Sequence, residues 1–571
     1  MDTLRRARFS GPPPTEGDDA FPMNLIRLLI AEGMTPRNRL LASAFVSGVS
    51  SAFVLAMVNM AAGEIAESGR EQVNWLLAGL FVLGLVLFAT AEVFLISRVC
   101  AGAETAVDAL RTRLLGRLCR ADFEKVESMG RAVFYESITQ GTQTLSQNSQ
   151  YLAIGLRSVV LIAAILVYIA YLSTTALILV LVFTLIGGAM FGFAGRRLNA
   201  RYADMMKEEA RLFESITDLL DGFKEVRLSS ARSRDLGQVF GAISQSATDI
   251  RVDVQVRAFQ QFILGEVAVF FLLAVVVFVV PLYSTSFHGD IVKVTMAVLY
   301  MTGPIGGLIQ TLPLLSGAEA AAGRMLALDA QLAAIAEPAV DPTAPPMPAD
   351  FREIALRGVE YAYGADEGKP SFVLGPVDLA VRRGEVVFIT GGNGSGKSTL
   401  IKLLTGLYRP HHGRIQVDGV AIGPDTRGAF QDMMAPVFSD YHLFPRLYGV
   451  PSIDGAMAQD LIAWFEMAGI VRFAEDRFDR LDLSAGQRKR LALIAALLEK
   501  RPILVIDEWA ADQDPHFRRK FYREMLPALK AKGMTIIAVT HDDAYFDVAD
   551  RRLHLDEGKL SELAVEPGGA K

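Results

Sequence analysis

Six long apolar segments before residue 315 are the strongest constraint on how this chain can fold. Each is about 20 residues long, which is enough for an α-helix to cross the hydrocarbon core of a bilayer. Hydrophobic residues make up 51% of the sequence and charged residues only 21%, which is unusually apolar for a soluble protein. We therefore predict an all-helical membrane domain that lies in a lipid bilayer. Its six predicted spans are 40–62, 75–96, 152–171, 175–194, 259–282 and 291–314.

Basic residues gather in alternate connections between these segments. The connections 98–150 and 196–257 are rich in arginine and lysine, whereas Glu64, Glu67 and Glu71 follow the first segment. Cytoplasmic loops of membrane proteins carry an excess of lysine and arginine, so both termini are predicted in the cytosol. The two basic connections are too long for turns, and we expect helices that extend beyond the membrane.

The amino-acid composition changes along the chain and predicts four parts. Residues 1–22 read as a disordered cytosolic tail, and 23–336 as the membrane domain with its helical extensions. Prolines crowd 337–350, a composition typical of a linker. From residue 351 to 571 short β-type runs alternate with helical patterns, as in an α/β domain. The net charge of −6 and the absence of a lysine/arginine block argue against nucleic acid as a partner.

Residues 391–398 read Gly-Gly-Asn-Gly-Ser-Gly-Lys-Ser, a phosphate-binding loop pattern between a predicted strand (385–390) and a predicted helix (399–404). Backbone N–H groups of such a loop point at one anion, and the helix N-terminus adds its positive dipole end. Lys397 is expected to neutralise phosphate charge, and the Ser398 hydroxyl to bind Mg²⁺. The predicted nucleotide-contacting set of the loop is Gly391, Asn393, Gly394, Ser395, Gly396, Lys397, Ser398 and Thr399.

Two adjacent carboxylates end a second apolar run, 502–506. We expect Asp507 to hold Mg²⁺ through water, and Glu508 to polarise the attacking water as general base. The sequence therefore predicts hydrolysis of a nucleoside triphosphate.

The segment Leu483-Ser484-Ala485-Gly486-Gln487 resembles the Leu-Ser-Gly-Gly-Gln signature of the ATP-binding-cassette family, with Ala485 as its one departure. The resemblance spans the whole chain. It implies an exporter-type, six-helix, all-α transmembrane domain fused to a cytosolic α/β P-loop ATPase domain, with ATP and Mg²⁺ as cofactors. In this family Ser484, Ala485, Gly486 and Gln487 face the nucleotide of a second ATPase domain. One chain carries one set of motifs, which implies a homodimer or a heterodimer with a similar half.

Further site residues follow from the same resemblance. Tyr363 stands where the family has an aromatic ring against adenine, with Tyr361 as the competing choice. His541, at the end of an apolar run, matches the switch histidine that contacts the γ-phosphate. Ser439 stands where the family has a glutamine and is expected to bind Mg²⁺ or a water. Asp514 keeps the final aspartate of the loop after Glu508.

Two short motifs resemble the branch of the family that exports cyclic or modified peptides and peptide siderophores, including syringomycin-type lipopeptides. They are residues 507–515 and Val437-Phe438-Ser439-Asp440…Leu443-Phe444. The resemblance implies ATP-driven efflux of a small peptide across the bacterial inner membrane by alternating access. A lipid or multidrug exporter, a siderophore importer and a non-transporting ATPase are the alternatives. Polar residues in the spans are candidates for the cargo cavity, because such groups are costly in a membrane. These are Asn59, Glu266, Thr302 and Gln310.

Overall fold

The structure is a computed structural model that describes residues 23–32, 37–68, 74–279, 291–337, 347–348, 350–363, 372–450 and 453–565. The predicted tail 1–22 and most of the predicted linker 337–350 therefore lie outside the described residues. The chain divides into two compact units: residues 1–116 with 131–332, and residues 117–130 with 333–571. We call them the helical unit and the ATPase unit.

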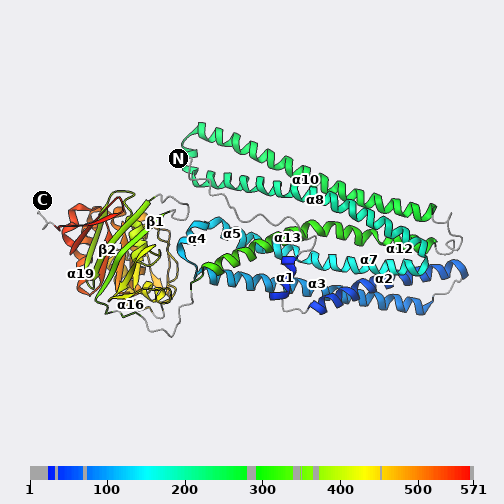
Figure 1. The fold of residues 1–571 in the computed structure, drawn as a ribbon, viewed down its shortest axis with the longest axis horizontal. Helices are drawn as coiled ribbons and strands as arrows, with labels where there is room; N and C mark the ends of the chain where they lie inside the picture. The colour runs from blue at the N-terminus through cyan, green and yellow to red at the C-terminus, as the bar shows by residue number, and fades with distance from the viewer. Residues whose placement is uncertain are drawn as a thin grey trace. The chain divides into compact units, whose positions relative to one another are not determined.

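The helical unit is built from long α-helices. Figure 1 shows them as extended ribbons, among which α8 pairs with α10 and α7 packs against α2. Its long helices are α2 (Arg37–Ser68), α3 (Trp75–Leu118), α7 (Gln150–Leu172), α8 (Thr174–Asp221), α10 (Ser230–Phe278) and α13 (Thr302–Ile335). Its shorter helices are α1 (Met23–Glu32), α5 (Arg131–Tyr135), α6 (Thr142–Asn148), α9 (Phe223–Arg227) and α12 (Ile291–Tyr300).

Five helical stretches of the described residues are long and apolar enough to cross a membrane: Asn38–Glu64, Trp75–Leu118, Val133–Leu172, Ser230–Phe278 and Ile291–Ile335. The predicted fourth span falls in α8, whose described apolar stretch, Thr174–Ala189, is shorter. Helices α3, α8 and α10 have 44, 48 and 49 residues, well beyond the roughly 20 that a bilayer needs. The surplus length corresponds to the extensions expected from the basic connections.

The ATPase unit contains a six-stranded sheet in the order β12-β11-β3-β10-β9-β6. Its strands are β3 (Val386–Gly391), β6 (Met434–Val437), β9 (Ile503–Asp507), β10 (Thr535–Val539), β11 (Arg551–Asp556) and β12 (Lys559–Leu563). All neighbouring pairs are parallel except β11 with β12. Every residue of β3, β9 and β10 is buried, as expected for a parallel sheet covered on both faces.

A second sheet, in the order β2-β1-β4-β5, is antiparallel. It consists of β1 (Glu353–Tyr363), β2 (Phe372–Arg382), β4 (His412–Val417) and β5 (Val420–Ala421). A hairpin joins β7 (Phe473–Ala474) and β8 (Arg477–Phe478). The helices of the unit are α14 (Lys397–Leu404), α15 (Arg427–Gln431), α16 (Gly455–Trp464), α17 (Ala485–Leu498), α18 (Pro515–Lys520) and α19 (Leu526–Ala531).

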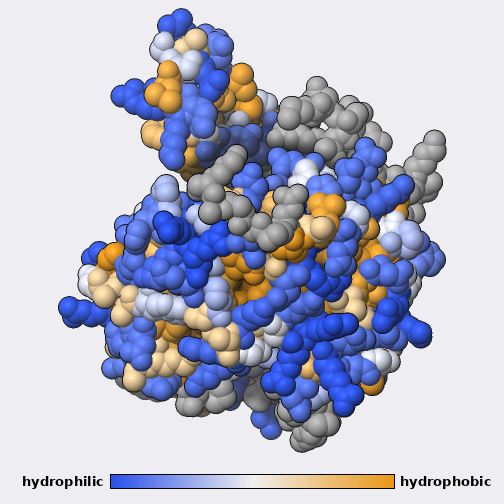
Figure 2. All heavy atoms as spheres, turned by 90° about the vertical axis from the view of Figure 1, so that its left-hand side faces the viewer, coloured by the Kyte–Doolittle hydropathy of each residue, from blue (hydrophilic) through white to orange (hydrophobic). Residues whose placement is uncertain are grey.

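One helix of the ATPase unit comes from far upstream in the chain. Helix α4 (Phe123–Met129) lies in the connection between the second and third predicted spans, yet it clusters with the C-terminal residues. Asp122 caps it by accepting hydrogen bonds from the backbone N–H groups of Glu124 and Lys125. The face of the ATPase unit in Figure 2 is mainly hydrophilic, with scattered hydrophobic side chains, as expected for a surface in contact with water.

Candidate nucleotide site

The phosphate loop joins the carboxyl end of β3 to the N-terminus of α14, where a parallel sheet binds ligands. Gly396 caps α14 with a φ of 103°, and a Cβ there would lie 2.8 Å from the Phe372 ring. Gly391 has a φ of 150°, and a Cβ there would collide with the carbonyl oxygen of Leu555. Only glycine fits both positions without strain. Gly392, Asn393 and Gly394 between them are exposed, and a loop of this kind can point backbone N–H groups at an anion.

Lys397 holds this loop together from inside. The side chain is buried, and its Nζ donates to the carbonyl oxygens of Gly391 at 3.0 Å and Gly392 at 2.9 Å. Ser398 is exposed beside it, whereas Thr399 is buried. The Ser395 hydroxyl is buried without a hydrogen-bond partner among the described residues. The loop therefore presents a cation, an exposed hydroxyl and several backbone donors in one place.

Asp507 and Glu508 lie at the carboxyl end of β9, the second strand from β3 in the sheet. Burial raises the pKa of Asp507 above its ordinary value, although hydrogen bonds from Ser439 favour the carboxylate. Ser439 is thus brought to Asp507, and this carboxylate–hydroxyl pair has the oxygen chemistry that Mg²⁺ prefers.

Glu508 adopts a left-handed backbone conformation with φ 48°, an uncommon state for a residue other than glycine. Its carbonyl oxygen accepts a hydrogen bond from Lys489 Nζ at 2.9 Å. Its carboxylate Oε1 lies 3.2 Å from His541 Nε2, and both side chains are partly exposed. The structure therefore brings together the two residues predicted to be catalytic, with their polar ends open to solvent.

The predicted signature residues begin α17. Ser484 caps the helix and forms a reciprocal capping box with Gln487. Ser484 and Ala485 are exposed, so the helix N-terminus can accept an anion from outside this chain. Within the described residues, no hydrogen bond links Ser484 to the phosphate loop.

The loop after Glu508 packs on the signature helix. The buried Gln513 donates from Nε2 to the Gly486 carbonyl at 3.0 Å and accepts from Arg490 Nε at 2.8 Å. Arg490 also pairs with Asp514 at 2.8 Å and stacks on Phe517, with its Cζ 3.5 Å from the ring centroid. Asp514 caps α18 by accepting from the Phe517 N–H, and this hydrogen bond holds the pKa of Asp514 below its ordinary value. Gln513 and Arg490 are site residues that the sequence analysis did not single out.

A cluster of aromatic rings joins the expected adenine region to α4. Tyr361 is only 1% exposed, which leaves no room for a base against its ring, whereas Tyr363 is partly exposed. The Tyr363 hydroxyl lies 3.3 Å from Thr399 Oγ1 and 3.4 Å from the Tyr408 hydroxyl. Tyr361 stacks on Tyr408 with ring centroids 4.9 Å apart. This geometry favours Tyr363 as the adenine candidate.

Two carboxylates of α4 bind this cluster. Glu124 accepts from the Tyr361 hydroxyl at 2.6 Å, and Glu127 accepts from the Tyr408 hydroxyl at 2.6 Å and from Lys402 Nζ at 2.9 Å. Burial and these hydrogen bonds raise the pKa of both Tyr361 and Tyr408. Lys402 belongs to α14, the helix that begins in the phosphate loop. Sequence reasoning missed these partners because they lie hundreds of residues apart.

The candidate cargo residues have different surroundings in the described part of the helical unit. Asn59 is buried, and its Nδ2 donates to the Tyr168 hydroxyl at 3.4 Å and the Lys293 carbonyl at 3.3 Å. Thr302 donates to the Leu299 carbonyl of its own chain segment at 2.7 Å. Glu266 and Gln310 are exposed on the helical unit.

A different polar cluster does form between the membrane helices. Glu92 of α3 pairs with Arg157 of α7 at 2.5 Å and accepts from the Ser47 hydroxyl of α2 at 2.6 Å. The Glu92 side chain is only 15% exposed. The sequence analysis did not select this pair, which ties three helices together.

Comparisons with known proteins show the family and the fold of this chain. The family model described as ABC transporter matches residues 374–511. The chain is 32% identical over 566 residues to the ATP-binding protein SyrD of Pseudomonas syringae pv. syringae, covering 94% of this chain and 96% of that protein. It is 28% identical over 385 residues to an ATP-dependent lipid A-core flippase of Burkholderia orbicola, covering 64% and 62% respectively.

Among solved structures, a bacterial Atm1-family ABC exporter with ATP bound has a similar fold, with a TM-score of 0.75 at 19% identity. That match covers 92% of this chain and 95% of the solved chain. The similarity therefore extends over both the helical unit and the ATPase unit.

Proposed function

This chain belongs to the ABC transporter family, as an exporter-type member that couples ATP hydrolysis to transport, and from this premise we propose that it exports a small cyclic or modified peptide. The proposed cargo is of the antibiotic or siderophore type. The proposed location is the bacterial inner membrane, with both termini in the cytosol.

One observation carries the choice of cargo. The loop 507–515 resembles that of the peptide-exporting branch. Its Gln513 is buried and forms hydrogen bonds within the site. Gln513 joins the Gly486 carbonyl to Arg490 and so connects the hydrolysis loop to the signature helix. The match to SyrD along nearly the whole chain supports the same branch.

In the proposed mechanism Lys397 leaves the loop carbonyls and pairs with the phosphates of ATP, while Tyr363 stacks on adenine. Mg²⁺, when bound with ATP, supplies charge neutralisation of the phosphates. Ser398, Ser439 and Asp507 are the residues that would hold it. Glu508 accepts a proton from the attacking water, and His541, 3.2 Å from Glu508 Oε1, orients that carboxylate and contacts the γ-phosphate.

Two copies of the chain complete two such sites in our proposal. The exposed N-terminus of α17, with Ser484 and Ala485, is positioned to accept the γ-phosphate held by the phosphate loop of the partner. A homodimer is the simplest assembly, because one chain carries an intact set of motifs. ATP closes the two ATPase units and turns the cargo cavity outward, and hydrolysis resets it.

The export of a lipid is the second candidate, because the chain is also similar to an ATP-dependent lipid A-core flippase. Purified protein in nanodiscs separates the two. We expect one class of cyclic or siderophore peptide to stimulate ATP turnover, and we expect Glu508→Gln to abolish that stimulation. Stimulation by lipid alone would replace the peptide proposal with the lipid one. Inverted vesicles then test direction, because an exporter accumulates the peptide inside them only when ATP is present outside.

A further inference from the structure

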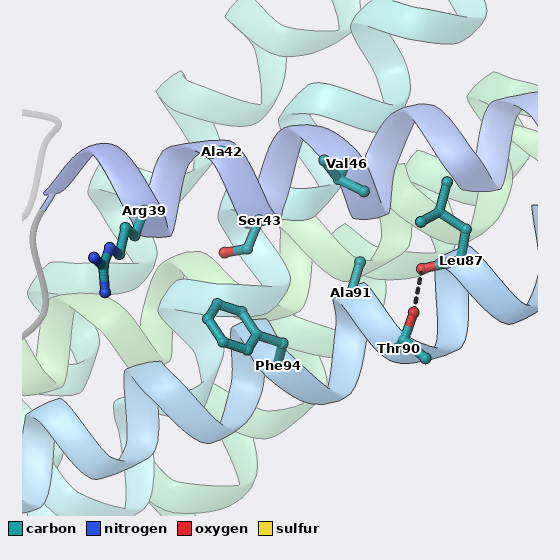
Figure 3. A pocket seen from close by; sticks show the side chains of 8 residues that line it. All are labelled: Arg39, Ala42, Ser43, Val46, Leu87, Thr90, Ala91 and Phe94. Atoms are coloured by element: carbon teal, nitrogen blue, oxygen red, sulfur yellow. Dashed lines mark hydrogen bonds between the residues drawn. The ribbon is translucent and has the colours of Figure 1, made fainter.

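A groove in the helical unit lies between α2 and α3 and has a volume of about 430 Å³. Volumes of about 300–1,000 Å³ are typical of sites that hold small molecules. Figure 3 shows Ser43 and Val46 of α2 facing Leu87, Ala91 and Phe94 of α3 across it, with Arg39 at one end. The distance from Arg39 to Val46 is two helical turns, about 10 Å along the helix. The groove is thus an elongated apolar slot with a cation at its mouth.

The polar groups on its walls need no partner from outside. The Ser43 hydroxyl donates to the Leu40 carbonyl at 2.9 Å, and the Thr90 hydroxyl donates to the Val86 carbonyl at 2.8 Å. Both bonds stay within the residue's own helix. The walls therefore present mainly carbon to an occupant, and an unbranched hydrocarbon chain can enter without leaving a polar group unsatisfied.

Arg39 lines one end of the groove, and a second arginine, Arg98, contacts Phe94 of its wall. No described residue forms an ion pair or hydrogen bond with Arg39, which is the second residue of the candidate span Asn38–Glu64 and lies in the first turn of α2. Arg98 of α3 lies over the ring of Phe94, with its Cζ 5.1 Å from the ring centroid, and its side chain is exposed. An apolar slot that ends at two arginines is complementary to an acyl chain joined to an anionic headgroup.

We propose that this groove binds an anionic phospholipid, with one acyl chain between α2 and α3 and its phosphate at Arg39 and Arg98. With the proposed orientation, the lipid comes from the cytoplasmic leaflet. The groove lies in the helical unit, whereas the nucleotide site lies in the ATPase unit. Its occupant would fill the gap between two helices that are otherwise joined at this level by the Ser47–Glu92 hydrogen bond.

Native mass spectrometry of the full chain tests the proposal. Protein is released from phosphatidylcholine nanodiscs that contain an equal share of phosphatidylglycerol, and retained lipids are counted. We expect wild type to retain phosphatidylglycerol over phosphatidylcholine. Arg39→Gln and Arg98→Gln should each lower the retained phosphatidylglycerol about fivefold, the effect of one basic residue near a membrane surface.

Matched variants distinguish the groove from the general surface. Ala91 lines the groove, whereas Ala89 is exposed on the same helix outside it. Ala91→Leu should abolish retention, while Ala89→Leu and Arg27→Gln, at an exposed arginine of α1, should leave it unchanged. Basal ATP turnover checks that each variant is folded. Equal retention of both lipids, equal retention by Ala91→Leu and wild type, or an empty groove because a second copy covers it would each overturn the proposal.

Discussion

Replacing Glu127 by glutamine should loosen α4 from the rest of the ATPase unit. The carboxylate accepts from Tyr408 at 2.6 Å and from Lys402 at 2.9 Å. Burial tends to raise the pKa of Glu127, but these two hydrogen bonds outweigh it and the net pKa is lowered. The anion is therefore the form that binds, and glutamine keeps the shape while removing the charge.

The expected cost follows from these contacts. A hydrogen bond to a charged group contributes about 1.5–3 kcal/mol, and a neutral one about 0.5–1.5 kcal/mol. Two bonds are affected, but the Glu127 side chain is 46% exposed, so solvent screens much of the gain from the lysine. The net loss is about 1–2 kcal/mol, which corresponds to a population of undocked α4 that is about 5–30 times larger.

Hydrogen exchange at the amides of residues 123–129 measures this population directly, because local opening sets their exchange rate. Exchange in Glu127→Gln should be about 5–30 times faster than in wild type. Lys125→Gln removes one charge from an exposed position of the same helix and should change little. Unchanged exchange in Glu127→Gln, or equal acceleration in both variants, would refute the role given to this carboxylate.

Three further results are expected. Gly396→Ala should abolish ATP binding in an equilibrium titration, because the added Cβ would lie 2.8 Å from Phe372 at a φ of 103°, whereas Gly392→Ala, with nothing within 4 Å, should bind normally. Gln513→Leu should lower the free energy of unfolding by about 1–3 kcal/mol in denaturant titrations, since it leaves Arg490 Nε and the Gly486 carbonyl without this partner. The pKa of Asp514 is lowered from 3.8 in the folded state, so its carboxylate stabilises the fold above pH 3.8 and loses that contribution as the pH falls through the folded-state pKa. The difference in unfolding midpoint between wild type and Asp514→Asn should therefore shrink below pH 3.8, and a difference that grows there would contradict this assignment.

The sequence was sufficient to predict the two-part architecture, because its signals are local. Apolar segments of about 20 residues indicate membrane helices, and the glycine spacing of 391–396 indicates one loop between one strand and one helix. Asp507 and Glu508 could be paired with that loop because the parallel strands of one sheet end at the same edge, even with β10 between β3 and β9.

Contacts between distant segments could not be predicted in this way. Glu127 and Tyr408 are 281 residues apart, and neither stands in a pattern that names its partner. The same holds for Glu92 and Arg157, whose pairing no local sequence pattern indicates. In a helix bundle, the partner of a polar residue depends on helix rotation, and periodicity alone does not fix which neighbours meet.

The membership of α4 in the ATPase unit affects how the protein can be made. A ribosome adds about 5–20 residues per second, so Glu127 is synthesised tens of seconds before Tyr408, which follows it by 281 residues. A helix of 7 residues is too short to be stable alone in water. We therefore expect residues 123–129 to form a stable helix only after the segment with Tyr408 has been synthesised and can bind it. Its docking is therefore a late step in biogenesis. An ATPase fragment expressed without residues 117–130 would expose Tyr408 and Lys402 to any other chain that offers a similar segment.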